Sequence, residues 1–547
     1  MALLARLSQL VPVYSAAILT SIGISSLLLA IVLSDYIDGW RRRRALRGIP
    51  IVDEGSCMSR RLRWTARGFD AGKELANAYN KYSKAGKPFA ARIQNDKYAI
   101  ALPPSSFKEW RVLGHEKLSF LHALSEFADL ALHMDVTGRT PIEAVHSCNN
   151  EPTLKVFQEF LSAEVDSNLP LVLDPPRPAH RGFEAKENPP KWMELNTMQG
   201  IFSVTSAIAT SLLLGNNPPN AASITAAAMA YNDAMMETRR LRTEYPWTLR
   251  RLIWHLAPAC RMLRSHRSRL HRLLTIEVTK RIHEARSGFG EETVPQRRPF
   301  SLMDVLIEAS FRNNSLDRAK RSQDEEQVVD LLVQQISLLH FELARPTGMN
   351  VILMLYAIVN HPEYLKPLRD EMTEALQLSG GKWSFDMLKS APKLESFARE
   401  TFRMHEISVF VGFRRVMQPL HLKSINLSLQ PGTLIMTPCR AVHYDPDNYA
   451  DPETFNGYRF YNPRTNSCAP RVTTTSSTFL SFSHGTVSCP GRNLATQITR
   501  ILFIQLLLRY DVELAHERMP PYGFHDGAIF FPNPGVRVRV KRREGGV

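Results

Sequence analysis

The sequence predicts a mainly α-helical protein with small β-sheets. Three stretches carry the helical part of this prediction, at residues 330–360, 392–404 and 494–508, because each is rich in apolar residues over a length typical of helices. The stretch at 330–360 is apolar on nearly all sides, so it belongs in a core. The strands are expected to be short, because alternating apolar and polar residues occur only in brief runs bounded by turn residues.

The bulk composition sets limits on size and partners. The chain of 547 residues is 44% hydrophobic and has a net charge of +15, so it can bury a large core and favours anionic partners. Apart from the four arginines at 41–44, the basic residues are scattered and form no recognisable nucleic-acid module, so no nucleic-acid partner is expected. The six cysteines include no Cys-x-x-Cys pair, which argues against a disulfide framework or a zinc site and favours a reducing compartment.

The N-terminal segment is predicted to anchor the protein in a membrane. Residues 7–33 carry no charge, and about 20 apolar residues span a bilayer, so a transmembrane helix is expected at about residues 11–33. The arginines at 41–44 then place the remaining chain in the cytosol. A cleaved signal peptide is the competing interpretation, but the apolar run is long for one. We therefore expect an anchor at residues 1–40 and a catalytic domain at residues 41–547.

The remaining elements are expected from periodicity and turn residues. In chain order they are a helix at 71–84, a hairpin of strands 88–94 and 97–102, helices over 153–280 broken at 173–190, surface loops at 286–298 and 313–327, strands at 420–429 and 433–436, a loop at 461–478, and a strand at 536–541. The hairpin has its turn at Asn95-Asp96, and the two later strands have theirs at Pro431-Gly432.

The most specific pattern runs from Phe482 to Arg492, where a strand end turns through small residues and enters the helix at 494–508. Gly485 and Gly491 permit unusual backbone dihedrals and a close approach to a large flat group. Cys489 precedes the start of the helix, where free N–H groups and the helix dipole lower the pKa of a thiol. A thiolate in a dry pocket is a soft, strongly donating ligand suited to haem iron. The alternative is a buried structural cysteine.

Glu400 and Arg403 are three residues apart on a predicted helix, so their side chains can form an ion pair. The residues around them are apolar, which favours a buried pair over one surface salt bridge among many. Arg459 supplies a third member, and the loss of one member of a buried ionic network costs about 3–5 kcal/mol.

The Phe-x-x-Gly-x-x-x-Cys-x-Gly spacing around Cys489 resembles the haem-binding loop of the cytochrome P450 family. Glu400, Arg403 and Arg459 resemble the family's buried ionic triad, in the same order along the chain. From about residue 40 to its end, the chain is similar to membrane-bound P450 enzymes of ascomycete fungi. The resemblance implies a cytochrome P450 fold behind a single transmembrane helix, with Cys489 as the axial ligand of haem b.

The resemblance also implies the activity and its partners. It predicts a haem-thiolate monooxygenase of secondary-metabolite biosynthesis that oxidises a small apolar molecule, such as a terpenoid or polyketide. The inserted oxygen atom would come from O₂, and the electrons would come from NADPH through cytochrome P450 reductase. The expected location is the endoplasmic reticulum membrane, single-pass, with membrane lipid around the anchor and the catalytic domain facing the cytosol. Phe482, Gly485 and Gly491 would then belong to the cofactor-binding loop.

Several positions depart from the family's pattern at the haem propionates. Relatives usually carry Arg or His two residues before the cysteine, where this chain has Val487. Arg414 resembles another propionate-binding position and can compensate, although a surface arginine is an equal alternative. In the region 145–154, where relatives carry a further basic residue, His146 is the residue here that can carry a positive charge.

The predicted central helix at residues 330–360 shows the largest departure from the family's pattern. Relatives carry an acid followed by a threonine that helps deliver protons to bound oxygen, and the matching positions here are Arg345 and Pro346, with Thr347 one step later. Because proline bends a helix, Thr347 is the candidate catalytic residue. Its hydroxyl can instead bond to a carbonyl of the preceding turn. Two other functions therefore stay open: an oxygen-independent isomerase, dehydratase or cyclisation enzyme, and a non-catalytic haem-binding protein.

Overall fold

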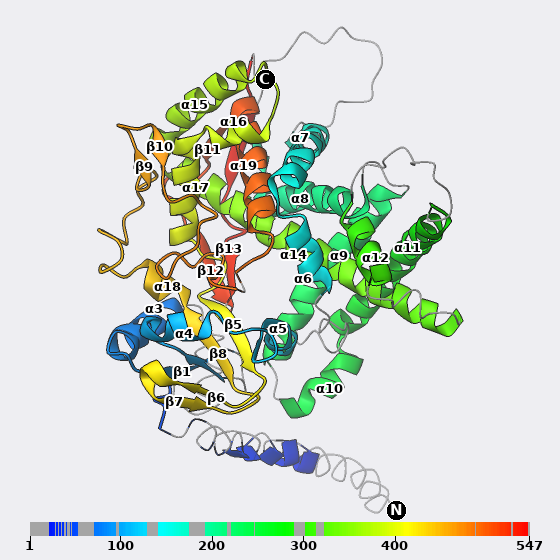
Figure 1. The fold of residues 1–547 in the computed structure, drawn as a ribbon, viewed down its shortest axis with the longest axis vertical. Coiled ribbons are helices and arrows are strands. Elements are labelled where there is room, and N and C mark those ends of the chain that lie inside the picture. Colours follow the sequence, from blue (N-terminus) through cyan, green and yellow to red (C-terminus); the bar gives the residue numbers. More distant parts are fainter. Residues whose placement is uncertain are drawn as a thin grey trace, which may run out of the picture.

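The computed structural model describes residues 71–93, 98–127, 140–173, 192–215, 220–244, 247–288, 301–312, 322–486, 488–526 and 529–544, with scattered residues between 21 and 52. Its longer helices are α3 (Ala71–Ala78), α5 (Phe120–Phe127), α6 (Thr140–Ser147), α7 (Glu151–Leu173), α8 (Thr197–Leu214), α9 (Ala221–Glu244), α10 (Trp247–Leu256), α11 (Pro258–Gly288), α12 (Leu302–Arg312), α14 (Ser322–Asn360), α15 (Leu365–Leu378), α17 (Pro392–Met404) and α19 (Arg492–Arg509). Shorter helices are α4 (Phe107–Trp110), α16 (Phe385–Lys389) and α18 (Cys439–His443). Figure 1 shows α14 crossing the middle of the helical part.

The strands form one larger sheet and several small ones. They are β1 (Phe89–Arg92), β2 (Tyr98–Ala101), β3 (Leu118–Ser119), β4 (Met193–Leu195), β5 (Phe410–Val416), β6 (Leu420–Leu422), β7 (Leu427–Leu429), β8 (Leu434–Pro438), β9 (Tyr461–Asn462), β10 (Ser467–Cys468), β11 (Tyr510–Leu514), β12 (Gly523–Asp526), β13 (Ile529–Pro532) and β14 (Val538–Arg542). The larger sheet has five strands in the order β1-β2-β8-β5-β3, and its strands gather at one end of the molecule, away from most helices (Figure 1).

Strand β5 carries an irregularity that matters for the site. It pairs antiparallel with β8, and the register shifts between Val411 and Arg414. Gly412 within this bulge has φ +65°, a conformation that glycine adopts without strain. Because a bulge turns side chains away from the regular alternation of a strand, the bulge sets the direction of Arg414.

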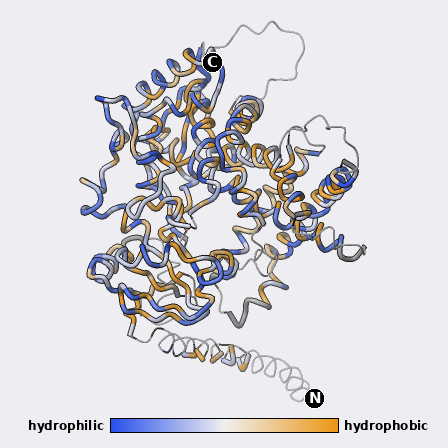
Figure 2. The backbone as a smooth tube through the Cα atoms, viewed as in Figure 1, coloured by the Kyte–Doolittle hydropathy of each residue, from blue (hydrophilic) through white to orange (hydrophobic). Residues whose placement is uncertain are grey.

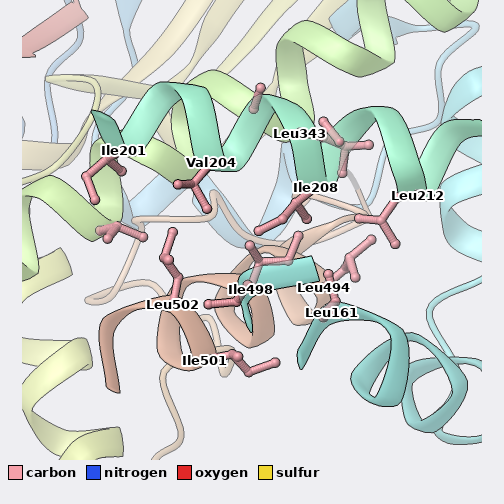
Figure 3. Close-up of a cluster of buried hydrophobic side chains, with 14 of the residues drawn as sticks. Leu161, Ile201, Val204, Ile208, Leu212, Leu343, Leu494, Ile498, Ile501 and Leu502 are labelled. Carbon is pink, nitrogen blue, oxygen red and sulfur yellow. The ribbon is translucent and has the colours of Figure 1, made fainter. Parts of the chain in front are cut away.

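Helix α14 is the centre of the core. It has 39 residues and is therefore about 58 Å long. Figure 3 shows Leu343 of α14 among apolar side chains of α8, such as Ile208, and of α19, such as Leu494 and Ile498. Gly348 permits the close contact with α8, because an added Cβ would lie 2.7 Å from Phe202 Cδ1.

The apolar residues form one large cluster among the helices and two smaller clusters at the larger sheet. Figure 2 shows hydrophobic residues recurring along the central helices and along the strands of that sheet. Burial of these faces, at about 25 cal/mol per Å² of apolar surface, is the main force that holds the layers together. The prediction of a mainly α-helical protein with small sheets is confirmed.

Most predicted elements are present with small shifts. Helix α17 has the predicted bounds, and the hairpin of β1 and β2 pairs Phe89 with Ala101. The predicted strand at 420–429 is wrong: β6 and β7 pair with each other around the short 3-10 turn Lys423–Ile425. The predicted loop at 313–327 is wrong at its end, because α14 already begins at Ser322. Residues 313–321 lie outside the described residues.

The membrane anchor predicted at residues 11–33 lies largely outside the described residues. Among the residues that the structure describes, one helix is long and apolar enough to cross a membrane, and it is α8. Because 78% of that segment is buried inside the protein, its apolar character belongs to the core.

Candidate active site around Cys489

The loop that carries Cys489 is folded by backbone hydrogen bonds and two left-handed residues. Ser483 has φ +58° and Gly485 has φ +89°. The Cys489 N–H donates to the Phe482 carbonyl at 2.9 Å, which closes the loop. A Cβ at Gly485 would lie 2.6 Å from the backbone oxygen of Arg111, so this position requires glycine both for its conformation and for space.

Gly491 has a different role. Its φ is −88°, which any residue adopts, so our expectation of unusual dihedrals holds for Gly485 and is wrong for Gly491. Gly491 is the N-cap of α19, and an added Cβ would lie 3.6 Å from Val145 Cγ1 of α6. The turn between α6 and α7 also contacts α19, because Asn493 Nδ2 donates to Asn149 Oδ1 at 2.8 Å.

The sulfur of Cys489 lies at the start of α19, as the sequence predicts, where the backbone N–H groups of Gly491 and Arg492 favour its thiolate form and act to lower its pKa. Its pKa is nevertheless raised to about 11, chiefly by burial and also by the charge of Glu342. Our expectation of a lowered pKa is therefore wrong, because the loss of water outweighs the helix dipole. Ionisation of this thiol needs a positive charge beside the sulfur, and a coordinated iron ion would provide one.

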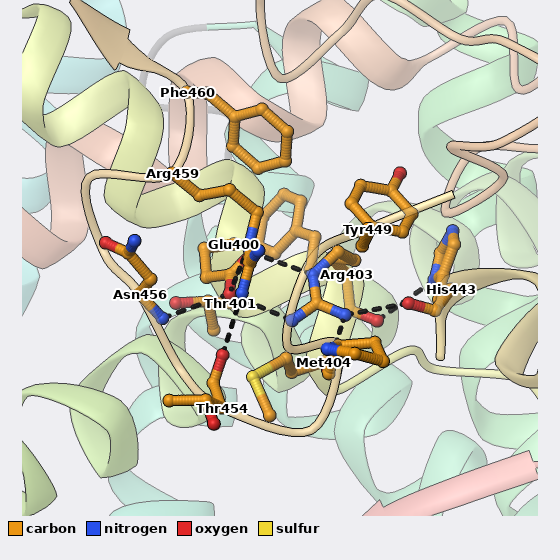
Figure 4. Close-up of polar contacts among 12 residues, drawn as sticks. Glu400, Thr401, Arg403, Met404, His443, Tyr449, Thr454, Asn456, Arg459 and Phe460 are labelled. Atoms are coloured by element: carbon orange, nitrogen blue, oxygen red, sulfur yellow. Dashed lines mark hydrogen bonds and ion pairs between the residues drawn. The ribbon is translucent and has the colours of Figure 1, made fainter. Parts of the chain in front are cut away.

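The structure brings Glu400, Arg403 and Arg459 together (Figure 4). Arg403 Nε lies 2.8 Å from one Glu400 oxygen, and Arg403 Nη2 lies 2.9 Å from the other. Arg459 Nε lies 3.0 Å from Glu400 Oε1. The side chains of Glu400 and Arg403 are completely buried, so this is a core network rather than a surface salt bridge.

The triad holds the chain that leads toward the cysteine loop. Arg403 Nη1 donates to the carbonyls of His443, at 2.7 Å, and Pro452, at 2.8 Å. His443 Nδ1 lies 2.9 Å from the Arg403 carbonyl, and the Leu480 N–H donates to His443 Nε2 at 2.8 Å. Because Nε2 accepts a hydrogen bond, His443 is neutral, and burial lowers its pKa to about 3.

Helix α17 carries two more buried charges, which sequence reasoning missed. Glu395 forms an ion pair with Arg500 of α19 and accepts the N–H of Val472 at 2.8 Å. Arg399 donates to the Thr474 carbonyl at 3.0 Å, and its guanidinium lies 3.6 Å from the ring centroid of Phe479. One available signal was the i,i+4 spacing of Glu395 and Arg399 within the same apolar helix.

Arg414 lies on β5 and is 2% exposed, so the alternative of a surface arginine is wrong. Its guanidinium is 5.3 Å from the ring centroid of Phe120. Burial lowers the pKa of Arg414 to about 9, and a buried cation is stabilised by an anionic group such as a carboxylate. Phe482 of the cysteine loop is also buried and packs edge-on against Phe402 of α17, with ring centroids 6.0 Å apart.

Arg345 of α14, which stands where relatives carry an acid, has a structural role. This residue forms an ion pair with Asp233 of α9, and its guanidinium lies 4.4 Å from the ring centroid of Phe202 of α8. Arg345 therefore ties α14 to two neighbouring helices. Helix α14 continues through Pro346. Thr347 is 1% exposed, and its hydroxyl has no hydrogen-bond partner among the described residues, so the alternative bond to the preceding turn is not formed.

The structure gives no direct support for the two remaining positions that the sequence associated with the haem propionates, His146 and Val487. His146 is exposed on α6, and its pKa is lowered by burial and by the charge of nearby Arg492. Arg492 donates to the Cys489 carbonyl at 2.9 Å, so a permanent cation stands beside the loop that His146 was expected to serve. Val487 lies outside the described residues.

These residues fit a haem. The partly buried thiol of Cys489 at the start of α19 is a suitable site for an iron-bound thiolate, and Arg414 is a buried cation suited to a propionate. The unpartnered hydroxyl of Thr347 suits a polar ligand, because buried polar groups are rarely left without a partner.

Comparisons with known proteins agree with this site. The family model described as Cytochrome P450 matches residues 164–540. The bicoumarin synthase of Aspergillus desertorum is 52% identical over 97% of this chain and 98% of its own length. A cytochrome P450 monooxygenase of Aspergillus flavus is 48% identical over 88% of this chain and 98% of its own, and the bicoumarin synthase of Aspergillus niger is 46% identical over 77% and 97%.

The fold is also that of a solved structure. Retinoic acid-bound cyanobacterial CYP120A1 superposes with a TM-score of 0.60 over 87% of this chain and 95% of that one, at 16% identity. Such a low identity shows the fold alone. With the family model covering most of the chain and relatives above 45% identity over most of their length, the chain belongs to the cytochrome P450 family, as a monooxygenase of the fungal secondary-metabolism type.

Proposed function

We propose that this P450 monooxygenase oxidises a small, apolar aromatic metabolite and joins two such molecules, as the names of its relatives from Aspergillus desertorum and Aspergillus niger say of those enzymes. The observation that carries the proposal is the 52% identity to a bicoumarin synthase over nearly the whole chain. At that identity over nearly the whole chain, the fold is shared. A polyketide-derived coumarin is therefore the substrate class to test first.

The roles of the site residues follow from their positions. Cys489 would hold the haem iron, Arg414 would pair with a propionate, and Phe482, Gly485 and Gly491 shape the loop that carries the cysteine. Glu400, Arg403 and Arg459 fix the chain before that loop. When bound, the haem-thiolate supplies the activation of O₂ with electrons from a redox partner. Thr347 contributes a buried hydroxyl in α14 that can hold a proton or a water molecule.

Coupling of two aromatic rings balances as an oxidation. Two ring C–H bonds break and one C–C bond forms, which releases two electrons and two protons. O₂ takes up these electrons and two more from NADPH, delivered by cytochrome P450 reductase, and becomes two molecules of water. The basic surface expected from the net charge of +15 favours an acidic redox partner.

We further propose that residues 1–40 anchor the protein and residues 41–547 form the catalytic domain. The uncharged run at 7–33 and the four arginines that follow support a single-pass protein of the endoplasmic reticulum membrane, with the catalytic domain facing the cytosol. Protease treatment of intact microsomes should then remove the catalytic domain and leave a short protected fragment.

The test uses the full chain with a fungal P450 reductase in yeast microsomes. Hydroxylated coumarins are supplied with NADPH and O₂, and products are identified by mass spectrometry. We expect a product of twice the substrate mass less two hydrogens, absent with Cys489→Ala. A product heavier by one oxygen atom would replace coupling by hydroxylation. Turnover in anaerobic, reductase-free microsomes would establish the oxygen-independent alternative, and ligand-dependent haem spectra without turnover would establish a non-catalytic protein.

A further inference from the structure

Glu342 is exceptional on α14. Between Leu332 and Asn360 it is the one residue with an exposed side chain, whereas its neighbour Leu343 is buried among the apolar residues of α8 and α19. A carboxylate in the middle of a core helix costs free energy unless it faces water, a partner or a ligand. The exposure of Glu342 therefore shows that its side chain borders an open space.

Although the side chain of Glu342 is accessible, protein atoms surround its carboxyl group, and the resulting loss of water raises its pKa to about 7. The accessible space therefore lies within the fold rather than at the outer surface. The charge of Glu342 also raises the pKa of Cys489, so the carboxyl lies within electrostatic range of the sulfur. Glu342 thus borders an internal space near the expected iron ligand, which is where the substrate of a haem-thiolate enzyme is oxidised.

The neighbouring cation does not neutralise Glu342. Arg345, three residues further along the same helix, is engaged with Asp233 of α9 and with the ring of Phe202. Burial is the cause of the raised pKa of Glu342, so its carboxyl keeps its capacity to bind a ligand group. A carboxylate accepts a hydrogen bond from a hydroxyl strongly, because hydrogen bonds to charged groups are about twice as strong as neutral ones.

We propose that Glu342 selects hydroxylated aromatic substrates by accepting a hydrogen bond from a ring hydroxyl group. This inference rests on the proposed function, because it concerns the aromatic substrate of the same site. The hydrogen bond holds the hydroxyl-bearing ring beside the cofactor. A methyl ether at the same ring position has no proton to donate and also adds bulk, so it is bound less tightly.

The test compares two probe compounds, 7-hydroxycoumarin and 7-methoxycoumarin, with the haem-loaded full chain. Dissociation constants are measured by titration calorimetry for the wild type, Glu342→Gln and Glu342→Leu. Glu326→Gln is the matched control, since Glu326 is an exposed glutamate near the start of the same helix. The Soret band of the reduced CO complex verifies that each variant is folded and loaded with haem.

We expect the wild type and Glu326→Gln to prefer the hydroxylated probe by roughly tenfold or more. The preference should shrink in Glu342→Gln and vanish in Glu342→Leu through weaker binding of 7-hydroxycoumarin, with the methoxy probe little changed. A wild type that binds the two probes equally, or binds neither, overturns the inference, as does a Glu342→Leu variant that keeps the preference.

The coupling assay separates this inference from the proposed function. If the wild type forms dimers and Glu342→Leu keeps the wild-type preference, the inference fails and the coupling function stands. If the preference depends on Glu342 but no coumarin is coupled, the coupling function fails and Glu342 remains a determinant of hydroxyl recognition.

Discussion

Glu395 of α17 and Arg500 of α19 form a buried ion pair between two helices that are 105 residues apart at these positions. Glu395 also accepts the N–H of Val472 at 2.8 Å, so one carboxylate joins α17, α19 and the segment that leads to the cysteine loop. Both side chains have 10% exposure or less. A charge in such a place depends on its partner for its stability.

We predict that Glu395→Ala lowers the free energy of unfolding by about 3–5 kcal/mol, because it leaves the Arg500 guanidinium buried without its counter-charge. Urea unfolding of the haem-loaded protein measures the change. Lys366→Ala is the control, since Lys366 pairs with Asp370 on α15 at 2.6 Å but both side chains are more than half exposed. An equal effect of the two substitutions would contradict a specific role of the buried pair.

The two glycines of the cysteine loop should respond differently to alanine. Gly485→Ala places a Cβ 2.6 Å from the Arg111 carbonyl oxygen at a residue with φ +89°, so we expect a loss of at least about 1–2 kcal/mol. Gly491→Ala meets only Val145 Cγ1 at 3.6 Å, with φ −88°, so its fold should persist. The measurements are urea unfolding and the Soret band of the reduced CO complex. Loss of haem from a folded Gly491→Ala protein would show that this glycine makes room for the cofactor.

Cys489→Ala should abolish the red-shifted Soret band of the reduced CO complex, because that band requires a thiolate on the iron. Cys468→Ala is the control: this cysteine lies on β10, is partly exposed, and its sulfur contacts the Pro470 carbonyl at 3.9 Å. If the band survives in Cys489→Ala and is lost in Cys468→Ala, the assignment of the ligand is wrong.

Acid should destabilise the fold through His340. This buried histidine of α14 lies 3.3 Å from both Thr210 Oγ1 and Asn232 Nδ2, and burial lowers its pKa to about 4. Because its pKa in the unfolded chain is near 6.5, the unfolded state takes up the proton first. The contribution of His340 to stability is therefore complete above pH 6.5 and is lost as the pH falls through 4.

The expected size of this effect is on the order of 3 kcal/mol. Unfolding free energies measured at pH 7 and pH 4 should differ less in His340→Gln than in the wild type. His421→Gln is the control, since His421 is exposed on β6, and it should keep the pH dependence of the wild type. An unchanged pH dependence in His340→Gln would contradict the assignment.

Local patterns made much of the fold predictable. The bounds of α17 and the pairing of Glu400 with Arg403 follow from spacing within one helix, and the position of Cys489 follows from a short motif. The partner of Glu395 was not predictable, because Arg500 lies in another helix and no local pattern connects them. The pKa of Cys489 was predicted in the wrong direction, because its burial depends on the packing of the whole chain.

Glu342 illustrates the same limit at the candidate site. Its acidic side chain is visible in the sequence, but whether a helical residue faces a core or an open space depends on the rotation of α14 against α8 and α19. Arg345 was noted as a departure from the family's pattern, yet its partner Asp233 lies on α9, more than 100 residues earlier. Contacts of this kind become known only from the folded arrangement.

The charges of α17 also set an order for biosynthesis. Glu400 forms an ion pair with Arg459, and Glu395 forms one with Arg500. Arg399 donates hydrogen bonds to the carbonyl groups of Arg471 and Thr474. All of these partners are synthesised after α17. A nascent chain that ends before Arg500 therefore holds α17 with an uncompensated carboxylate and cannot bury it. The helices around Cys489 therefore reach their folded arrangement only after α19 has been synthesised, so haem insertion is expected to follow the emergence of Arg500 from the ribosome.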